Sequence, residues 1–317
     1  MNTRISITGL VRKTGFSKNK ILFLLKKMRR RYAFFSKVNW MKIGLVKLII
    51  ILDKPWPWDK IVYPDSVTNI SESYEGKQVV SYLIPPSDAI AEILDSYKGF
   101  IRDYMVLDNI LYPNYRFLKY FNNGRIEIDT ALILEKTLEK EETITTNKTK
   151  KKHCCYRISE LDVKILNKLF AKPLTPTKRI AEELGERYDK VRRHIDLLFK
   201  REIIEGYFVG GINIFGKLLF GLIIRIKLED TNKTEALAWK LSNIPPFSII
   251  YYNSKGDIIV NIPVYKKLLE NLQKIPKIFK NKFNNNVDIY VMSLERKFKF
   301  DVDTKMYNKY IKTFILK

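Results

Sequence analysis

The 317-residue chain carries 58 Lys and Arg residues against 34 Asp and Glu residues, a formal net charge of +24. Its 46% hydrophobic content excludes a disordered chain, and its length allows two or more domains. The charge favours a polyanionic partner, because neutralised phosphates release counterions, with an anionic membrane surface as the competing partner. The longest apolar run, at 48–52, is too short to span a bilayer, and no apolar signal region follows Met1. We therefore expect a cytoplasmic protein with no membrane association.

Helices and strands are predicted to alternate through the first half of the chain. Ser17 is placed to cap a basic helix, and residues 12–31 hold nine basic residues and no acidic one. The run at 43–52 is nearly continuous in branched apolar residues, which indicates a strand buried on both faces. We predict helices at 3–13, 17–31, 87–97 and 130–142 and strands at 33–38, 43–52, 70–74, 79–84, 102–107 and 117–121.

A polar and then basic stretch at 143–157 is predicted to be a linker between the halves. It contains His153, Cys154 and Cys155, but no second group of ligands accompanies them, so we expect no metal site. The second half is predicted to hold helices at 159–170, 176–184, 188–201, 234–241 and 264–275, an apolar segment entering a strand at 203–209, and strands at 217–228, 248–253, 257–262 and 288–294, before a basic tail.

One helix of the second half combines an apolar face with a cationic one. Val191, Ile195 and Leu198 recur at helical spacing and form the apolar face. The opposite face carries the cations Lys190, Arg192, Arg193 and Lys200. Such a helix suits docking into a DNA groove while a small core holds it, although an ordinary solvated surface helix has the same pattern.

The two halves repeat each other. Gly15 and Gly185 are separated by the same number of residues as Ile21 and Val191. The same offset relates Leu25 to Ile195, Met28 to Leu198 and Phe34 to Ile204, and with small shifts Gly44 matches Gly216 and Gly76 matches Gly256. Agreement of so many features in one order predicts an internal duplication.

The second half resembles the leucine-responsive regulator/AsnC (Lrp/AsnC) family of transcriptional regulators. The resemblance covers residues 155–295 and depends on ISELDVKILNKLF (158–170), IAEELG (180–185), VRRHIDLL (191–198) and IIEGYFV (203–209). The first half resembles the family through VRKTGFSKNKILFLLKKM (11–28). The family pattern implies a winged helix-turn-helix followed by a ferredoxin-like α/β sandwich, which mediates oligomerisation and in many members binds an amino acid.

This resemblance implies double-stranded DNA as the partner. Where the family usually begins its recognition helix with Ser-Pro, this chain has Arg187 and Tyr188. We expect base and phosphate contacts from the second half and mainly positive charge from the first. The predicted DNA-binding residues are Arg187, Tyr188, Lys190, Arg192, Arg193, Lys200 and Arg201, together with Lys18, Lys20, Lys26 and Arg30 of the first half.

A small-molecule effector is a second implied partner. Gly256 and Asp257 fall where the family has a glycine-aspartate turn near its effector site, but a further aspartate of that turn is replaced by Ile259. Gly256 and Asp257 are therefore predicted either to bind an effector such as an amino acid or to form only a hairpin turn.

The first half departs from the second at two points. Phe23 stands where the second half has Arg193, and we expect it to pack against protein, with a thymine methyl as the alternative contact. No segment of the first half matches the helix at 159–170. We hypothesise that the helix at 130–142, through Leu134 and Leu138, covers the core left open beside Leu10 and Leu25.

Enzyme motifs are absent from the sequence. It has no phosphate-binding loop, no glycine-rich dinucleotide turn and no Ser/His or Cys/His pair in a supporting context, so we expect a protein that is not an enzyme and has no cofactor. Two alternatives stay open. A nucleoid-type protein would bind DNA without sequence preference. Siroheme decarboxylases resemble the same family and act on an anionic tetrapyrrole using histidine and arginine, but two histidines and a large positive charge disfavour them here.

Together the internal duplication and the family resemblance imply an α+β protein with two copies of a winged helix-turn-helix followed by a ferredoxin-like sandwich. We expect a sequence-specific transcriptional regulator that is a monomeric pseudo-dimer or a homodimer. The predicted domains are a degenerate winged helix-turn-helix at 1–40, a sandwich at 41–129, a helix and basic linker at 130–157, a winged helix-turn-helix at 158–212 and a sandwich with a basic tail at 213–317.

Overall fold

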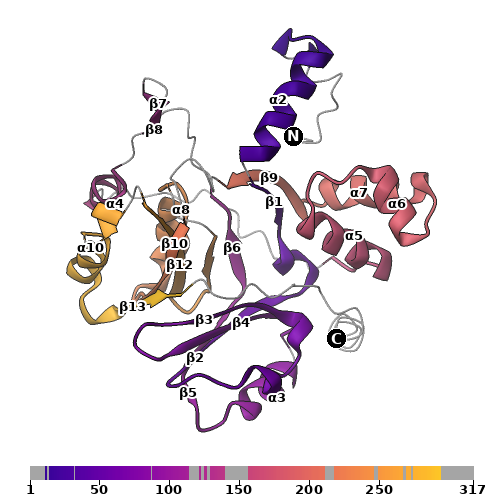
Figure 1. The fold of residues 1–317 in the computed structure, drawn as a ribbon. Coiled ribbons are helices and arrows are strands. Elements are labelled where there is room, and N and C mark those ends of the chain that lie inside the picture. The colour runs from indigo at the N-terminus through magenta and orange to yellow at the C-terminus, as the bar shows by residue number, and fades with distance from the viewer. Residues whose placement is uncertain are drawn as a thin grey trace. The chain divides into compact units, whose positions relative to one another are not determined.

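The computed structural model is a mixed α+β protein, as the sequence predicts (Figure 1). It describes residues 11–12, 14–31, 33–86, 88–113, 121–122, 125–126, 129–139, 156–210, 218–245, 249–266, 269–272 and 274–293. These belong to two compact units, each built from both halves of the chain. The first unit comprises Met1–Ile43 and Tyr156–Gly216, and the second comprises Gly44–Cys155 and Lys217–Lys317.

In the first unit, three helices pack beside a two-stranded sheet. The helices α5 (Glu160–Ala171), α6 (Thr177–Leu184) and α7 (Tyr188–Lys200) follow one another, and α2 (Lys18–Arg31) precedes β1. The strands β1 (Ala33–Val38) and β9 (Ile204–Gly210) pair antiparallel, so each half of the chain supplies one strand.

Local chemistry explains where these helices begin and end. Ser159 forms a capping box with Asp162, in which each side chain accepts from the other residue's backbone N–H, and this fixes the start of α5. Gly185 ends α6 with φ +65°, a left-handed conformation that costs glycine little, and the chain turns there into α7. The Ser36 hydroxyl donates to the carbonyl of Leu169 at 2.8 Å and ties β1 to α5.

The second unit contains two antiparallel sheets with related strand order. The four-stranded sheet runs β3-β4-β2-β5, and the larger one runs β11-β12-β10-β13 and continues from β11 to β6. In the smaller sheet β2 pairs with β4 and β5, and in the larger sheet β10 pairs with β12 and β13, so the first long strand of each sheet has the same pairing. The strands are β2 (Val46–Leu52), β3 (Val67–Glu72), β4 (Gln78–Ile84), β5 (Ile101–Leu107), β6 (Asn109–Leu111), β10 (Leu218–Lys227), β11 (Ile250–Tyr252), β12 (Asp257–Tyr265) and β13 (Val287–Met292), with a separate short pair β7 (Phe121–Asn122) and β8 (Arg125–Ile126).

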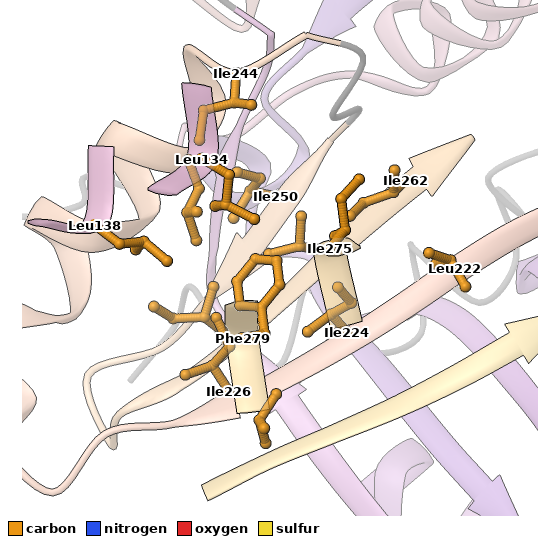
Figure 2. Packing of buried hydrophobic residues seen from close by; sticks show 14 of the residues in the cluster. Leu134, Leu138, Leu222, Ile224, Ile226, Ile244, Ile250, Ile262, Ile275 and Phe279 are labelled. Carbon is orange, nitrogen blue, oxygen red and sulfur yellow. The ribbon is translucent and has the colours of Figure 1, made fainter. Parts of the chain in front are cut away.

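Helices cover one face of each sheet. The smaller sheet packs against α3 (Asp88–Ser96) through a cluster that includes Ile50, Tyr82 and Ile93. The larger sheet packs against α8 (Thr234–Ser242), α10 (Lys274–Phe283) and α4 (Thr130–Glu139), and Figure 2 shows Phe279, Leu134 and Leu138 around its buried isoleucines. The short helix α9 (Leu269–Leu272) precedes α10.

The other faces of the two sheets are joined by a third cluster. Alternate residues of β2 and β5, such as Ile49, Ile51 and Met105, contact Ile223 of β10, Ile259 of β12 and Tyr290 of β13. Side chains on a strand alternate between its faces, which is why β2 is buried on both sides, as its continuous apolar run predicts.

Several sequence predictions need correction. The helix predicted at 130–142 does not cover the first-unit core: Leu134 and Leu138 are buried in the larger sheet's cluster instead, because α4 contacts α10 and α8. The helix predicted at 264–275 is displaced, since β12 continues to Tyr265 and helix resumes at α9 and α10. The pairing of Val264 with Phe220 and of Tyr265 with Leu218 outweighs the apolar helical pattern there. The strand β6 was not predicted. The predictions for 3–10, 117–120, 143–155 and the basic tail lie outside the described residues.

Candidate functional site

The helix α7 has the predicted two-faced character. Val191, Ile195 and Leu198 are buried, and the residues between them are exposed or half-buried. The exposed side holds a shallow depression lined by Asp189, Arg192, Arg193, Asp196, Leu197 and Lys200. The cations therefore share this face with two carboxylates, a mixture that tempers its positive charge.

The predicted DNA-binding cations in and next to α7 differ in whether a neighbouring group of the protein already pairs with them. Lys190 is held by Glu186 at 2.9 Å, and Arg192 approaches Asp196 at 3.9 Å. Arg201 donates to the carbonyl of Arg157 at 3.4 Å and lies over the ring of Tyr156. Within the described part of the chain, Arg193 and Lys200 have no ion-pair partner. Arg187 and Tyr188 stand at the start of the helix, where no side-chain cap is made, and Tyr188 is exposed.

The first-half helix α2 presents cations and an uncovered aromatic ring. Lys18, Lys20 and Lys26 are exposed, and Lys20 Nζ lies 4.2 Å from the ring centroid of Phe16. Phe23 is 64% exposed, so the expectation that it packs against protein is wrong. Ile21 is the buried residue of this turn, and no described element covers the opposite face. Arg30 lies in α2, but its side chain is outside the described residues.

Gly256 and Asp257 form the turn into β12. Gly256 has φ +96°, and a Cβ atom there would lie 2.3 Å from the carbonyl oxygen of Leu228, so close backbone packing requires glycine. The Asp257 carboxylate accepts from Asn253 at 3.0 Å and pairs with Arg225 at 3.4 Å. These contacts hold both residues in the hairpin turn, and their effector-binding role stays a prediction.

Two cations lie within the interface between the sheets. Arg225 of β10 pairs with Asp103 of β5, with Asp257 and, at 3.7 Å, with Asp288. Burial alone lowers the pKa of Arg225, but Asp103 and Asp257 outweigh this and raise it. The second cation, Lys47, lies on β2, four residues before Ile51, which pairs with Asp103. Lys47 is 5% exposed. Burial lowers the pKa of Lys47 to about 7.

Among the described residues, Lys47 contacts uncharged groups. Its ammonium group donates to the hydroxyl of Thr68, which in turn donates to the carbonyl of Ser81 at 3.1 Å. The ring centroid of Tyr251 lies 5.3 Å from Lys47 Nζ. Sequence reasoning missed both interface cations. Their signal is a single Lys or Arg within an otherwise apolar strand, in VKLIIIL and LIIRIK.

Three other features of the described residues bear on function: a histidine contact, groups of metal ligands and membrane-spanning helices. His194 Nδ1 lies 2.8 Å from Asp162, so this histidine joins α7 to the capped start of α5. Within the described ranges no group of three or more His, Cys, Asp and Glu side chains is placed to hold a metal ion. The helices described are also all too short or too polar to cross a bilayer. His153, Cys154 and Cys155 lie outside the described residues.

The fold along the whole chain is similar to that of an enzyme. The crystal structure of the siroheme decarboxylase NirDL, in co-complex with an iron-uroporphyrin III analogue, matches with a TM-score of 0.53 at 12% identity, over 98% of this chain and 92% of that chain. A second NirDL structure matches with the same TM-score at 11% identity. AsnC of E. coli matches 44% of this chain, with a TM-score of 0.30 at 17% identity. No family model and no curated protein matches the sequence.

These comparisons correct the functional prediction. The expectation of a sequence-specific transcriptional regulator that is not an enzyme is contradicted, because the two NirDL structures, which match nearly the whole chain, are of a decarboxylase.

Proposed function

We propose that this chain is a siroheme decarboxylase-like protein that binds a carboxylate-bearing tetrapyrrole. The observation that carries the proposal is the match to NirDL over 98% of the chain, since a shared local module would match only one half. The finer architecture that we propose with it is two winged helix-turn-helix modules and two ferredoxin-like sandwiches in tandem. The order β11-β12-β10-β13, with α8 and α10 on one face, supports the sandwich assignment.

The charge of the protein is compatible with such a ligand. A tetrapyrrole with several carboxylates is a polyanion, and the formal net charge of +24 attracts it as it would nucleic acid. Decarboxylation of a side chain breaks a C–C bond, releases CO₂ and adds a proton to the remaining carbon, without net oxidation. A protein catalysing it supplies a binding site and a proton donor. The histidine that the structure describes, His194, is engaged with Asp162 in the first unit, so we do not assign it this role.

Direct binding and turnover test this proposal. Purified protein is titrated with iron-uroporphyrin III, and the absorption spectrum is followed; separately, siroheme is incubated with the protein and the products are analysed by mass spectrometry. We expect saturable spectral changes and loss of CO₂ from siroheme. An Arg192→Ala/Arg193→Ala variant, altered only on the exposed face of α7, serves as the control and should bind and react like the wild type. Absence of saturable binding at low and physiological salt would exclude the proposal.

A second candidate function, DNA binding, is favoured by the exposed cations of α7. Arg193 and Lys200 are exposed cations without ion-pair partners among the described residues, and such cations are free to contact phosphates. We propose contacts from these two residues to the phosphates of double-stranded DNA without base reading. Arg187, Tyr188, Lys190, Arg192 and Arg201, with Lys18, Lys20, Lys26 and Arg30, remain predicted contributors of lesser weight.

Salt dependence tests this second candidate. Affinity for two unrelated duplexes is measured at two salt concentrations. The Arg193→Ala/Lys200→Ala variant should bind both duplexes more weakly to the same extent and lower the salt slope by about 2, one for each phosphate contact. Lys98→Ala, an exposed lysine of the second unit, is the matched control. Equal slopes in all three proteins would contradict phosphate contacts by Arg193 and Lys200.

A further inference from the structure

Lys47 is a buried cation that lacks a counter-ion in the described part of the chain. Its side chain is 5% exposed, and its two described contacts are the Thr68 hydroxyl and the Tyr251 ring. An ammonium group has three N–H donors, and the hydroxyl accepts only one of them. Lys47 therefore keeps hydrogen-bonding capacity that these neighbours do not use.

Among the described residues, no carboxylate pairs with Lys47. Leu83 of β4 and Leu107 of β5 stand opposite Lys47 in the strand pairing, and β3 contributes Thr68. Tyr251 of β11 is the titratable neighbour, and its burial raises its pKa, so it stays neutral. The carboxylates of the interface, on Asp103, Asp257 and Asp288, are gathered around Arg225 instead. Among described residues, burial is thus the whole cause of the lowered pKa of Lys47.

Such an arrangement is unfavourable for a purely structural residue. An unpaired buried charge costs free energy, and an apolar side chain of similar size in the same place would pack without that cost. Lys47 and Thr68 are each the second residue of their strands, so they lie towards the ends of β2 and β3. An external anion that reaches this position would complete the hydrogen bonds of Lys47 and keep it charged.

We propose that Lys47 binds a carboxylate of an organic anion at the interface between the two sheets, with Thr68 and Tyr251 as its neighbours. The identity of the anion as a tetrapyrrole rests on the proposed function, whereas the need for a carboxylate rests on Lys47 itself. Binding then requires the charged form of Lys47, so the affinity for the anion falls as Lys47 loses its proton.

The experiment compares wild type, Lys47→Met, Lys47→Arg and the exposed control Lys98→Met, titrated with iron-uroporphyrin III at about pH 6 and about pH 8.5, on either side of the value for Lys47. We expect the wild type and Lys98→Met to bind at least about tenfold more weakly at the higher pH. Lys47→Arg keeps its charge at both pH values and should lose this difference. Lys47→Met should bind weakly at both. Circular dichroism and thermal midpoints establish that each variant is folded.

Two further outcomes separate this inference from the proposed function. If Lys47→Met binds iron-uroporphyrin III with wild-type affinity and the wild-type pH difference, the Lys47 site is overturned and tetrapyrrole binding stands. If the wild type does not bind iron-uroporphyrin III, the proposed function fails, and mellitate, a small aromatic polycarboxylate, becomes the probe. Thermal stabilisation by mellitate of wild type and Lys47→Arg, but not of Lys47→Met, then supports the Lys47 site. Equal response of all variants to mellitate overturns it.

Discussion

The guanidinium group of Arg225 in β10 donates to the carboxylate of Asp103 in β5, and so joins the two sheets of the second unit across their shared interface. Asp257 and Asp288 approach the same guanidinium group, which leaves three carboxylates around one cation. Removal of the cation would leave these carboxylates to repel one another in a partly buried place.

Arg225→Leu is therefore expected to lower the free energy of unfolding by about 3 kcal/mol, the cost of removing one partner of a largely buried ion pair. Asp288→Asn, at the most exposed of the three carboxylates, should change it by less than about 1 kcal/mol. Urea unfolding measures both. A change in Arg225→Leu no larger than that in Asp288→Asn would show that the ion pair does not hold the sheets together.

The two hairpin glycines of the second unit make a matched pair. Gly76 and Gly256 both have positive φ, but a Cβ atom at Gly76 would meet nothing within 4 Å, whereas at Gly256 it would lie 2.3 Å from the carbonyl oxygen of Leu228. Gly76→Ala should cost about 1 kcal/mol, for the left-handed conformation alone. Gly256→Ala should cost clearly more, because the hairpin backbone must also move away from β10. Thermal unfolding of the two variants, compared with wild type, gives the difference, and equal losses would contradict the close approach.

The placement of α4 makes a third prediction. Leu134 is fully buried in the cluster of the larger sheet (Figure 2). Leu132, on the same helix, is 45% exposed. Leu134→Ala should destabilise the protein by about 2–5 kcal/mol, and Leu132→Ala by less than about 0.5 kcal/mol. Chemical unfolding followed by fluorescence distinguishes them. Similar, small effects of both substitutions would mean that α4 does not dock on this sheet.

Lys47 gives stability a predictable dependence on pH. In the unfolded chain the pKa of a lysine is about 10.4, and in the fold burial lowers that of Lys47 to about 7. Between these values the unfolded chain binds more protons, so Lys47 makes stability rise with pH, by at most about 1.4 kcal/mol per pH unit. Lys47→Met should remove that rise.

The comparison must stop near pH 10, because the raised pKa values of buried tyrosines such as Tyr82 and Tyr251 reverse the trend above that pH. Urea midpoints at several pH values in the absence of ligand provide the test. Parallel pH profiles of wild type and Lys47→Met would show that Lys47 keeps its ordinary pKa.

The sequence predicted most elements because their signals are local. The spacing of Val191, Ile195 and Leu198 defines α7, and the branched residues of 43–52 define β2 and its burial on both faces. The destination of α4 depended on contacts with α10 and α8, far along the chain, which periodicity does not encode. The same holds for Lys47 and Arg225, because the pattern of a strand shows that a cation is unusual there but not which residues of the opposite sheet it meets. The functional prediction failed because the motifs at 158–209 indicate a local fold, and a local fold does not specify whether the chain acts as a regulator or as an enzyme.

The exchange of elements between the halves has a consequence for how the chain is made. The strand β6 and the helix α4 come from the first half, yet they pair with β11 and pack on the second half's sheet. During synthesis these segments leave the ribosome more than a hundred residues before the strand that β6 joins, so they wait, with Leu134 and Leu138 uncovered, until the rest of the sheet emerges. A chain consisting of residues 156–317 alone would lack β6 and α4. The edge of β11 would then be unpaired, and the apolar surface that α4 covers would be exposed. The two halves of the chain are thus mutually dependent, and a split gene would have to deliver both products together to recover one folded molecule.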